Sequence, residues 1–125
     1  MALVHATSGD IVNVRPLGSE LASASSRAIL KSNDLEIMRL VLQAGKSMPE
    51  HCVPGEVTLH CIEGTVEVQA HGKTQVLRAG DMMYLRGGEP HAVKALEDAS
   101  LLHTILLKRD ADGALSGHVT NHKPS

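Results

Sequence analysis

Alternation of apolar and polar side chains is the clearest pattern along this chain. Residues 65–70 read Thr-Val-Glu-Val-Gln-Ala, a period of two that is typical of a strand with one buried face. The His-Gly step at 71–72 predicts the tight turn of a hairpin. Glycine- and proline-containing turns recur at short intervals between residues 45 and 91. Short strands between regularly spaced turns predict an all-β sandwich or barrel.

Two segments, residues 37–42 and 101–107, are apolar on both faces of a predicted strand. Such strands need cover on both sides. The inside of a small barrel covers one face, so we expect the other to meet either a second subunit or the N-terminal segment. A homodimer is the resulting prediction.

The pattern divides the chain into three parts. Residues 1–34 are expected to form an N-terminal arm packed on the barrel, with one strand at 11–15 and a short helix or loop at 17–29. Residues 35–109 are expected to hold the barrel itself. Residues 110–125 are rich in turn formers and are expected to be a loosely held C-terminal tail.

Composition narrows the class of protein. The chain has 125 residues, and its 12 Lys plus Arg against 14 Asp plus Glu give a net charge of −2. Without a basic patch, nucleic acid is not an expected partner. No apolar run approaches the roughly 18 residues of a membrane helix, so a membrane span is not expected either. Without a signal-like N-terminus, Cys52 and Cys61 indicate reduced thiols of a cytoplasmic protein.

Histidine is abundant where aromatic residues are almost missing. Eight His stand beside a single Tyr, Tyr84, with no Phe or Trp. This balance predicts an aliphatic interior in which recognition depends on imidazoles rather than on ring stacking. His118 and His122 fall in the C-terminal tail, where we expect them to be exposed to solvent.

Two segments resemble the motifs of the cupin superfamily. Residues 45–64 are similar to the first motif, G-x5-H-x-H-x3-4-E-x6-G, and residues 80–95 are similar to the second, G-x5-P-x-G-x2-H-x3-N. The matched glycines are Gly45, Gly64, Gly80 and Gly88. The resemblance implies a small antiparallel β-barrel of the jelly-roll type, commonly dimeric, with its site inside the barrel and a short N-terminal extension outside it.

The ligand positions of the two motifs are only partly kept. In the family, the first motif supplies two His and one Glu, and the second supplies one His. The corresponding residues here are His51, Val53, Val57 and His91. Catalytic metal sites usually take at least three protein ligands and keep an open position. Two imidazoles alone would therefore hold a metal weakly.

Three residues are candidates for a third ligand. Glu56 stands one residue before the expected glutamate, on the opposite strand face unless the Pro-Gly turn at 54–55 or a bulge shifts the register. Cys61 shares the inward parity of Val57, but lies deep along the strand. His103 belongs to a strand whose register is not fixed by the sequence.

The interior that results is partly apolar, because valines replace two ligands. Such a cavity with a few convergent polar groups suits a small molecule. Imidazoles that titrate near neutral pH, and a nearby guanidinium, favour an anionic or carbonyl-bearing ligand. The residues assigned to this pocket are His51, Val53, Val57, Cys61, Tyr84, Arg86 and His91.

Two functions follow from this pattern. The first is a small-molecule-binding cupin barrel without the full three-His, one-Glu metal site, non-catalytic or sensory, and with no tightly bound metal. The alternative is a metal-dependent oxygenase or isomerase, in which a divalent transition metal is bound at a divergent site built on His51 and His91. A barrel that chiefly provides a dimer surface is a third possibility. The fold hosts many activities and does not choose among them.

Overall fold

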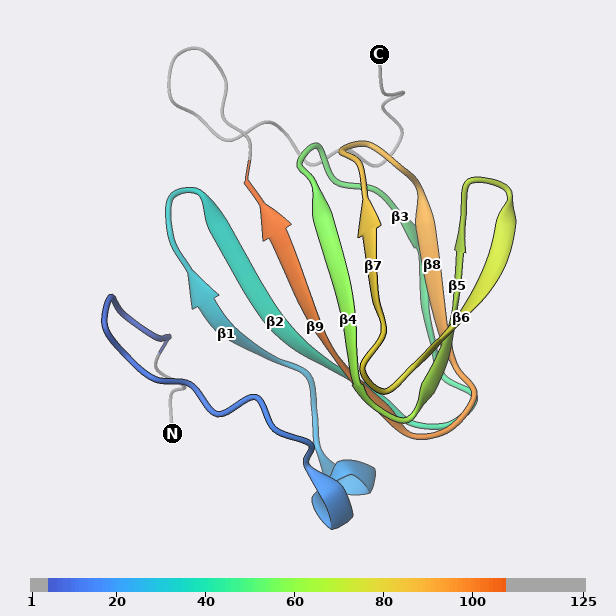
Figure 1. Cartoon of the computed structure of the whole chain (residues 1–125), viewed down its shortest axis with the longest axis horizontal. Helices are drawn as coiled ribbons and strands as arrows, with labels where there is room; N and C mark the ends of the chain where they lie inside the picture. Colours follow the sequence, from blue (N-terminus) through green and yellow to red (C-terminus); the bar gives the residue numbers. More distant parts are fainter. Residues whose placement is uncertain (1–4, 108–125) are drawn as a thin grey trace.

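Two antiparallel sheets face each other across an aliphatic core and converge at the lower end of Figure 1. The computed structural model describes residues 5–107. In sequence order the elements are η1 (Gly18–Ser23), a 3-10 helix, and the strands β1 (Arg27–Lys31), β2 (Leu35–Leu42), β3 (Ser47–His51), β4 (Val57–Glu63), β5 (Thr65–Ala70), β6 (Lys73–Arg78), β7 (Met82–Leu85), β8 (His91–Ala95) and β9 (Ala99–Leu106). Residues 5–107 contain no helix with the length and apolar character of a membrane span.

Apart from the β1–β2 and β5–β6 pairs, consecutive strands lie in different sheets. One sheet has the order β1-β2-β9-β4-β7 and the other has the order β3-β8-β5-β6. Consecutive strands such as β4 and β5 lie in different sheets, so the chain crosses the core several times. The described part of the chain is therefore nearly all-β and antiparallel, as the sequence predicts.

The hairpin predicted from the alternating segment is confirmed. The segment is β5, Thr65–Ala70, and Ala70 pairs with Lys73 at the start of β6. His71 and Gly72 both have positive φ, at 54° and 73°. A two-residue turn of type I′ requires this conformation at both central positions.

The core consists of aliphatic side chains on the facing sides of the two sheets. Because side chains alternate along a strand, one face of each strand points inward. The core of the described residues includes Leu40, Val57, Leu59, Cys61, Val66, Val68, Leu77, Leu85, Val93 and Leu101. With no Phe or Trp in the chain, the interior is aliphatic, as the composition predicts.

The N-terminal arm covers part of the outer face of the larger sheet. Arg39 on β2 and Ser100 on β9 are buried there. The Arg39 guanidinium donates to the carbonyl of Arg15 at 2.9 Å and to the Ser100 hydroxyl at 3.2 Å. The cover expected over these two strands is thus supplied, at this end of the sheet, by the N-terminal segment.

The Glu63 carboxylate also joins the arm to the sheet. Glu63 accepts the backbone N–H groups of Leu17 at 2.9 Å and Gly18 at 3.1 Å, and the Ser100 hydroxyl at 2.6 Å. Burial raises the pKa of Glu63, but these donors and the nearby Arg39 guanidinium more than offset it, so the pKa lies below its usual range. The carboxylate is therefore ionised at neutral pH.

The strand expected at residues 11–15 is wrong. The structure has no strand there, and Ile11 is 98% exposed. The strand of the arm is β1, which pairs with β2 along one edge. On the other edge, the Ile29 carbonyl of β1 accepts the N–H of Ala6. Local alternation cannot form a strand without a neighbouring backbone to pair with. The tail at 110–125, with its histidines, lies outside the described residues.

The crossing between β4 and β5 generates the first prediction. Gly64 makes this crossing with a φ of +80°, and a Cβ there would lie 2.1 Å from the Asp98 carbonyl oxygen. Gly64→Ala combines left-handed strain of about 1–2 kcal/mol with overpacking of about 1–3 kcal/mol. We expect urea unfolding to show both losses. Gly45→Ala is the control, because Gly45 has a φ of +84° and open space around it. Equal losses in the two variants would contradict the close approach.

Candidate metal centre

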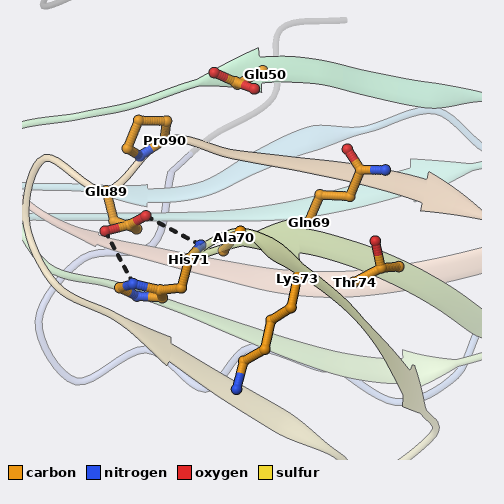
Figure 2. A pocket seen from close by; sticks show the side chains of 9 residues that line it. Glu50, Gln69, Ala70, His71, Lys73, Thr74, Glu89 and Pro90 are labelled. Carbon is orange, nitrogen blue, oxygen red and sulfur yellow. Dashed lines mark hydrogen bonds and ion pairs between the residues drawn. The ribbon is translucent and has the colours of Figure 1, made fainter.

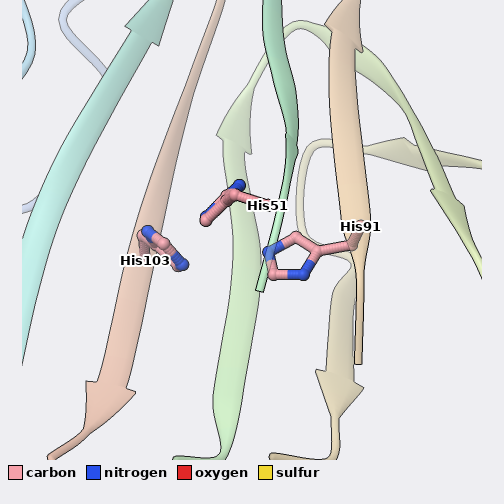
Figure 3. A group of neighbouring side chains, drawn as sticks. All are labelled: His51, His91 and His103. Carbon is pink, nitrogen blue, oxygen red and sulfur yellow. The ribbon is translucent and has the colours of Figure 1, made fainter. Parts of the chain in front are cut away.

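Three histidines from both sheets converge in the interior. His51 ends β3, His91 begins β8 and His103 lies in β9, and Figure 3 shows the three rings pointing toward one another. Their ligand nitrogens all lie within 4.8 Å of each other. The ring centroids are 4.5 Å apart for His51 and His91, and 6.3 Å from His103 to each. In the described part of the chain, this is the one such group of metal-binding side chains.

Strand pairing places these rings on the inner faces. His51 is paired with His91 across β3 and β8, and directly opposite residues of an antiparallel pair project to the same side. His103 is paired with Leu59 of β4, which is fully buried in the core. His103 must therefore point inward as well.

Backbone carbonyls orient two of the three rings. His91 Nδ1 lies 3.0 Å from the Glu89 carbonyl oxygen, and His51 Nδ1 lies 3.2 Å from the Pro49 carbonyl oxygen. Because a carbonyl oxygen only accepts, both Nδ1 atoms carry the proton. The Nε2 atoms of both rings are then left with a lone pair, which is the form that binds a metal.

Two ring nitrogens in this cluster are buried without a partner. His91 and His103 are 1% and 4% exposed. Among the buried side-chain nitrogen and oxygen atoms of residues 5–107, only His91 Nε2 and His103 Nε2 have no hydrogen-bond partner. An unsatisfied buried polar atom costs about 1–3 kcal/mol. Such a cost in a native interior calls for an explanation such as an ion.

The interior keeps these imidazoles neutral. Burial, followed by the nearby His91 and His51 rings, lowers the pKa of His103 to about 4. Burial also lowers the pKa of His91, with His51 adding to the effect and the Glu89 carbonyl opposing it. Neutral imidazole is a common ligand of Zn, Cu, Fe and Ni.

The residues fit a metal ion in number and chemistry. Metal–nitrogen bonds of about 2.0–2.1 Å put two ligand nitrogens about 3–4 Å apart, so the cluster is close to a bound arrangement. Three protein ligands with an open position are the usual make-up of a catalytic site. Of the three candidates for the third ligand, the structure brings His103 beside His51 and His91.

The other two candidates lie elsewhere. The Cys61 thiol is buried and donates to the carbonyls of Glu63 and Gly64, both at 3.5 Å. Burial raises the pKa of Cys61, which keeps it a thiol rather than a metal-binding thiolate. Glu56 accepts the Tyr84 hydroxyl at 2.9 Å on the exposed side of the sheet. Because side chains alternate along a strand, Glu56 points outward where its neighbour Val57 points inward.

The remaining pocket residues divide into two groups. Val57 belongs to the core and Val53 packs against it, on the side of the histidines. Tyr84 is 58% exposed and is paired with Thr58 on the outer face. Arg86 follows the end of β7 and is exposed, with its Nε 3.3 Å from Glu89. Assigning Tyr84 and Arg86 to the interior pocket was therefore wrong.

Comparison with known proteins agrees with this architecture. The cupin domain model matches residues 38–105. This chain belongs to the cupin family. The resemblance to the cupin superfamily is thus confirmed, and the candidate site combines the two motif histidines with one from β9. A search of curated protein sequences finds no match.

Solved cupin-like structures share the fold at low identity. A conserved protein of unknown function from Streptococcus pyogenes is 23% identical, with a TM-score of 0.66, over 89% of this chain and 100% of that chain. A cupin superfamily protein from Desulfitobacterium hafniense is 20% identical, with a TM-score of 0.66, over 78% and 95%. A salicylate 1,2-dioxygenase from Pseudaminobacter salicylatoxidans is 19% identical, with a TM-score of 0.59, over 64% of this chain and 25% of that one. At these identities the likeness extends to the fold alone.

Burial of neutral His103 predicts how stability depends on pH. An unfolded histidine binds its proton near pH 6.5, whereas folded His103 does so near pH 4. Between these values the unfolded chain binds more protons, so stability falls as the pH falls from 6.5 toward 4, by up to about 3 kcal/mol. We expect urea unfolding in EDTA to show this loss.

His103→Gln should make that pH dependence shallower. His60→Gln is the matched control, because His60 lies on the outer face of β4, opposite Leu102. If His60→Gln made the pH dependence of the unfolding free energy as shallow as His103→Gln does, the loss would not come from the buried ring.

Proposed function

We propose that this cupin binds one divalent transition metal ion through His51, His91 and His103, and presents it to a small anionic molecule. The observation that carries the proposal is the pair of buried, unpartnered Nε2 atoms on His91 and His103. One ligand nitrogen of each of these rings lies within 4.8 Å of a ligand nitrogen of the half-buried His51 ring. A metal ion would satisfy both atoms at once.

The chain's own residues would prepare the site before any ion enters it. The carbonyls of Pro49 and Glu89 set the tautomers of His51 and His91, and burial lowers the pKa of His91 and His103. Val53 and Val57 stand where the family places a His and a Glu, so they leave coordination positions open. When bound there, a divalent metal acts as a Lewis acid toward an oxygen of the ligand.

Charge balance supports an anionic ligand. Besides the histidines, the buried polar residues in the described part of the chain are Arg39 and Ser100, and both lie on the outer face, under the N-terminal arm. An imidazole that binds a metal brings no charge, so three histidine ligands leave a divalent ion with its full charge in an aliphatic interior, and a buried charge is costly unless it is paired. A carboxylate or an enolate bound at the open positions would supply the missing negative charge.

Of the two functions inferred from the sequence, the metal-dependent oxygenase or isomerase now has the stronger support. It needs a third ligand, and His103 meets that need, whereas the metal-free binding barrel leaves two buried nitrogens unexplained. The inner face offers few other groups for chemistry. Among the core residues, Cys61 alone carries an ionisable side chain. Any reaction there would depend on the metal and the imidazoles.

We also propose that the sheets close into a jelly-roll barrel and that two chains associate through the larger sheet. Met82 and Tyr84 on β7 are 63% and 58% exposed, and Leu106 on β9 is exposed too. These residues lie on the outer face that the N-terminal arm leaves open. The boundaries at residues 34 and 109 and the cytoplasmic location stay predictions.

Metal content tests the proposed site. After reconstitution with Fe, Mn, Co, Ni, Cu and Zn in turn and desalting, we expect about one ion per chain for at least one metal. His91→Ala and His103→Ala should each lose the ion, because two ligands hold it weakly. His60→Ala should keep it. A wild-type chain that retains none of these metals would refute the proposal.

Sizing with light scattering tests the dimer. At tens of micromolar we expect twice the 13.3 kDa mass of one chain. Met82→Glu should shift the mass toward the monomer, because it buries a charge in the contact. Val76→Glu, on β6 of the smaller sheet, is the control and should remain dimeric. A monomeric wild type would exclude the dimer.

A further inference from the structure

We infer that the side chain of Glu89 is a positioning residue for His91. Its carboxylate fastens the loop before β8 to the turn between β5 and β6. The backbone carbonyl of the same residue then accepts the Nδ1 proton of His91 and leaves Nε2 available as a ligand. The inference rests on the proposed metal site and names a residue outside the three ligands that controls it.

Three donors meet the Glu89 carboxylate. Oε2 accepts the backbone N–H of His71 at 3.2 Å, and Oε1 lies 3.3 Å from His71 Nδ1 and 3.3 Å from Arg86 Nε. Figure 2 shows both contacts with His71, one to its backbone nitrogen and one to its ring. The carboxylate is only 10% exposed, which makes these contacts stronger than those of a solvated pair.

The partner of this carboxylate sits in an unusual backbone conformation. His71 has a φ of 54° and is the one residue other than glycine with a positive φ in the described chain. Gly, Asn or Asp would suit this turn position without strain. A histidine here presents both its N–H and its ring to Glu89. Its predecessor Ala70 is paired with His91, so the contact spans the strand pair beside the ligand.

The loop itself is held from its other side as well. Gly88 donates to the Val53 carbonyl at 2.7 Å, and the Glu89 N–H donates to the Arg86 carbonyl at 3.3 Å. A Cβ at Gly87 would lie 2.1 Å from the Pro54 carbonyl oxygen, so the loop packs closely on the link between β3 and β4. The Glu89 side chain adds the tie to β5 and thereby fixes the direction of the Glu89 carbonyl.

These contacts line a groove on the protein surface. The groove has a volume of about 430 Å³, and its lining includes Ala70, His71, Gly72, Glu89 and Pro90. It therefore lies over the turn and the loop, whereas the His91 ring points into the core. A change at Glu89 alters the ligand's hydrogen bond without replacing any atom of the interior.

Removal of the carboxylate should release the ring of His91. In Glu89→Ala the loop loses its tie to the turn, and the Nδ1–H tautomer loses its fixed acceptor. Part of the population then carries its proton on Nε2, which cannot bind a metal in that form. Loss of such an outer hydrogen bond typically lowers metal affinity 10–100-fold. Glu89→Gln keeps an oxygen acceptor for the His71 N–H and should restore most of the affinity.

Long-range proton–nitrogen NMR of the metal-free protein reads the tautomer directly. We expect Nδ1–H for His91 in the wild type and in Glu89→Gln, and a raised fraction of Nε2–H in Glu89→Ala. Calorimetric titration with Zn²⁺ alone should show the 10–100-fold loss for Glu89→Ala. Glu97→Ala removes an exposed carboxylate just beyond the end of β8 and should change neither reading.

An unchanged tautomer and an unchanged Zn²⁺ affinity in Glu89→Ala would overturn the inference. If that variant does not fold, His71→Asn takes its place, because Asn suits the turn conformation and removes the ring contact. An unchanged tautomer in His71→Asn would then overturn it. A wild type that binds no Zn²⁺ or other metal refutes the proposed function instead, and the tautomer of the metal-free protein still tests the role of Glu89.

Discussion

The burial of His91 and His103 between two aliphatic sheets is the constraint on which this site depends. Burial disfavours the charged form of both rings and so lowers their pKa values. It also leaves His91 Nε2 and His103 Nε2 without a hydrogen-bond partner. Neutral rings, fixed tautomers and unpaired nitrogens are what a metal ion requires of its ligands. Strand pairing buries the rings, and the Pro49 and Glu89 carbonyls fix the tautomers of His51 and His91.

The surface of the protein maintains this interior arrangement. Each oriented ring donates its Nδ1 proton to a carbonyl oxygen two residues upstream, at Pro49 and at Glu89. The loop that carries Glu89 is fixed by the turn between β5 and β6 and by the link between β3 and β4. The tight crossing at Gly64 and the Glu63 contact with the N-terminal arm act on the other end of the sheets. The site thus rests on turns and loops as much as on the ligands.

Local patterns predicted most of the fold but not the site. Motif glycines and the alternation at residues 65–70 predicted the antiparallel sheets and the hairpin, and the resemblance to the cupin motifs put His51 and His91 at ligand positions. The inward direction of His103 depends on its pairing with Leu59, which lies 44 positions earlier in the chain, and such register is not a local property. The outward direction of Tyr84 follows from its pairing with Thr58, again through register. The sequence predicts turns at His71 and before His91, but it does not predict the contact between Glu89 and His71 that joins them.

X-ray absorption of the metal-loaded protein tests the central claim most directly. A site built from His51, His91 and His103 predicts three imidazole nitrogens at about 2.0–2.1 Å from a zinc ion, with no sulfur neighbour. A sulfur at about 2.3 Å would place a cysteine in the site. A spectrum with fewer than three imidazoles, or with a cysteine ligand, would contradict the account.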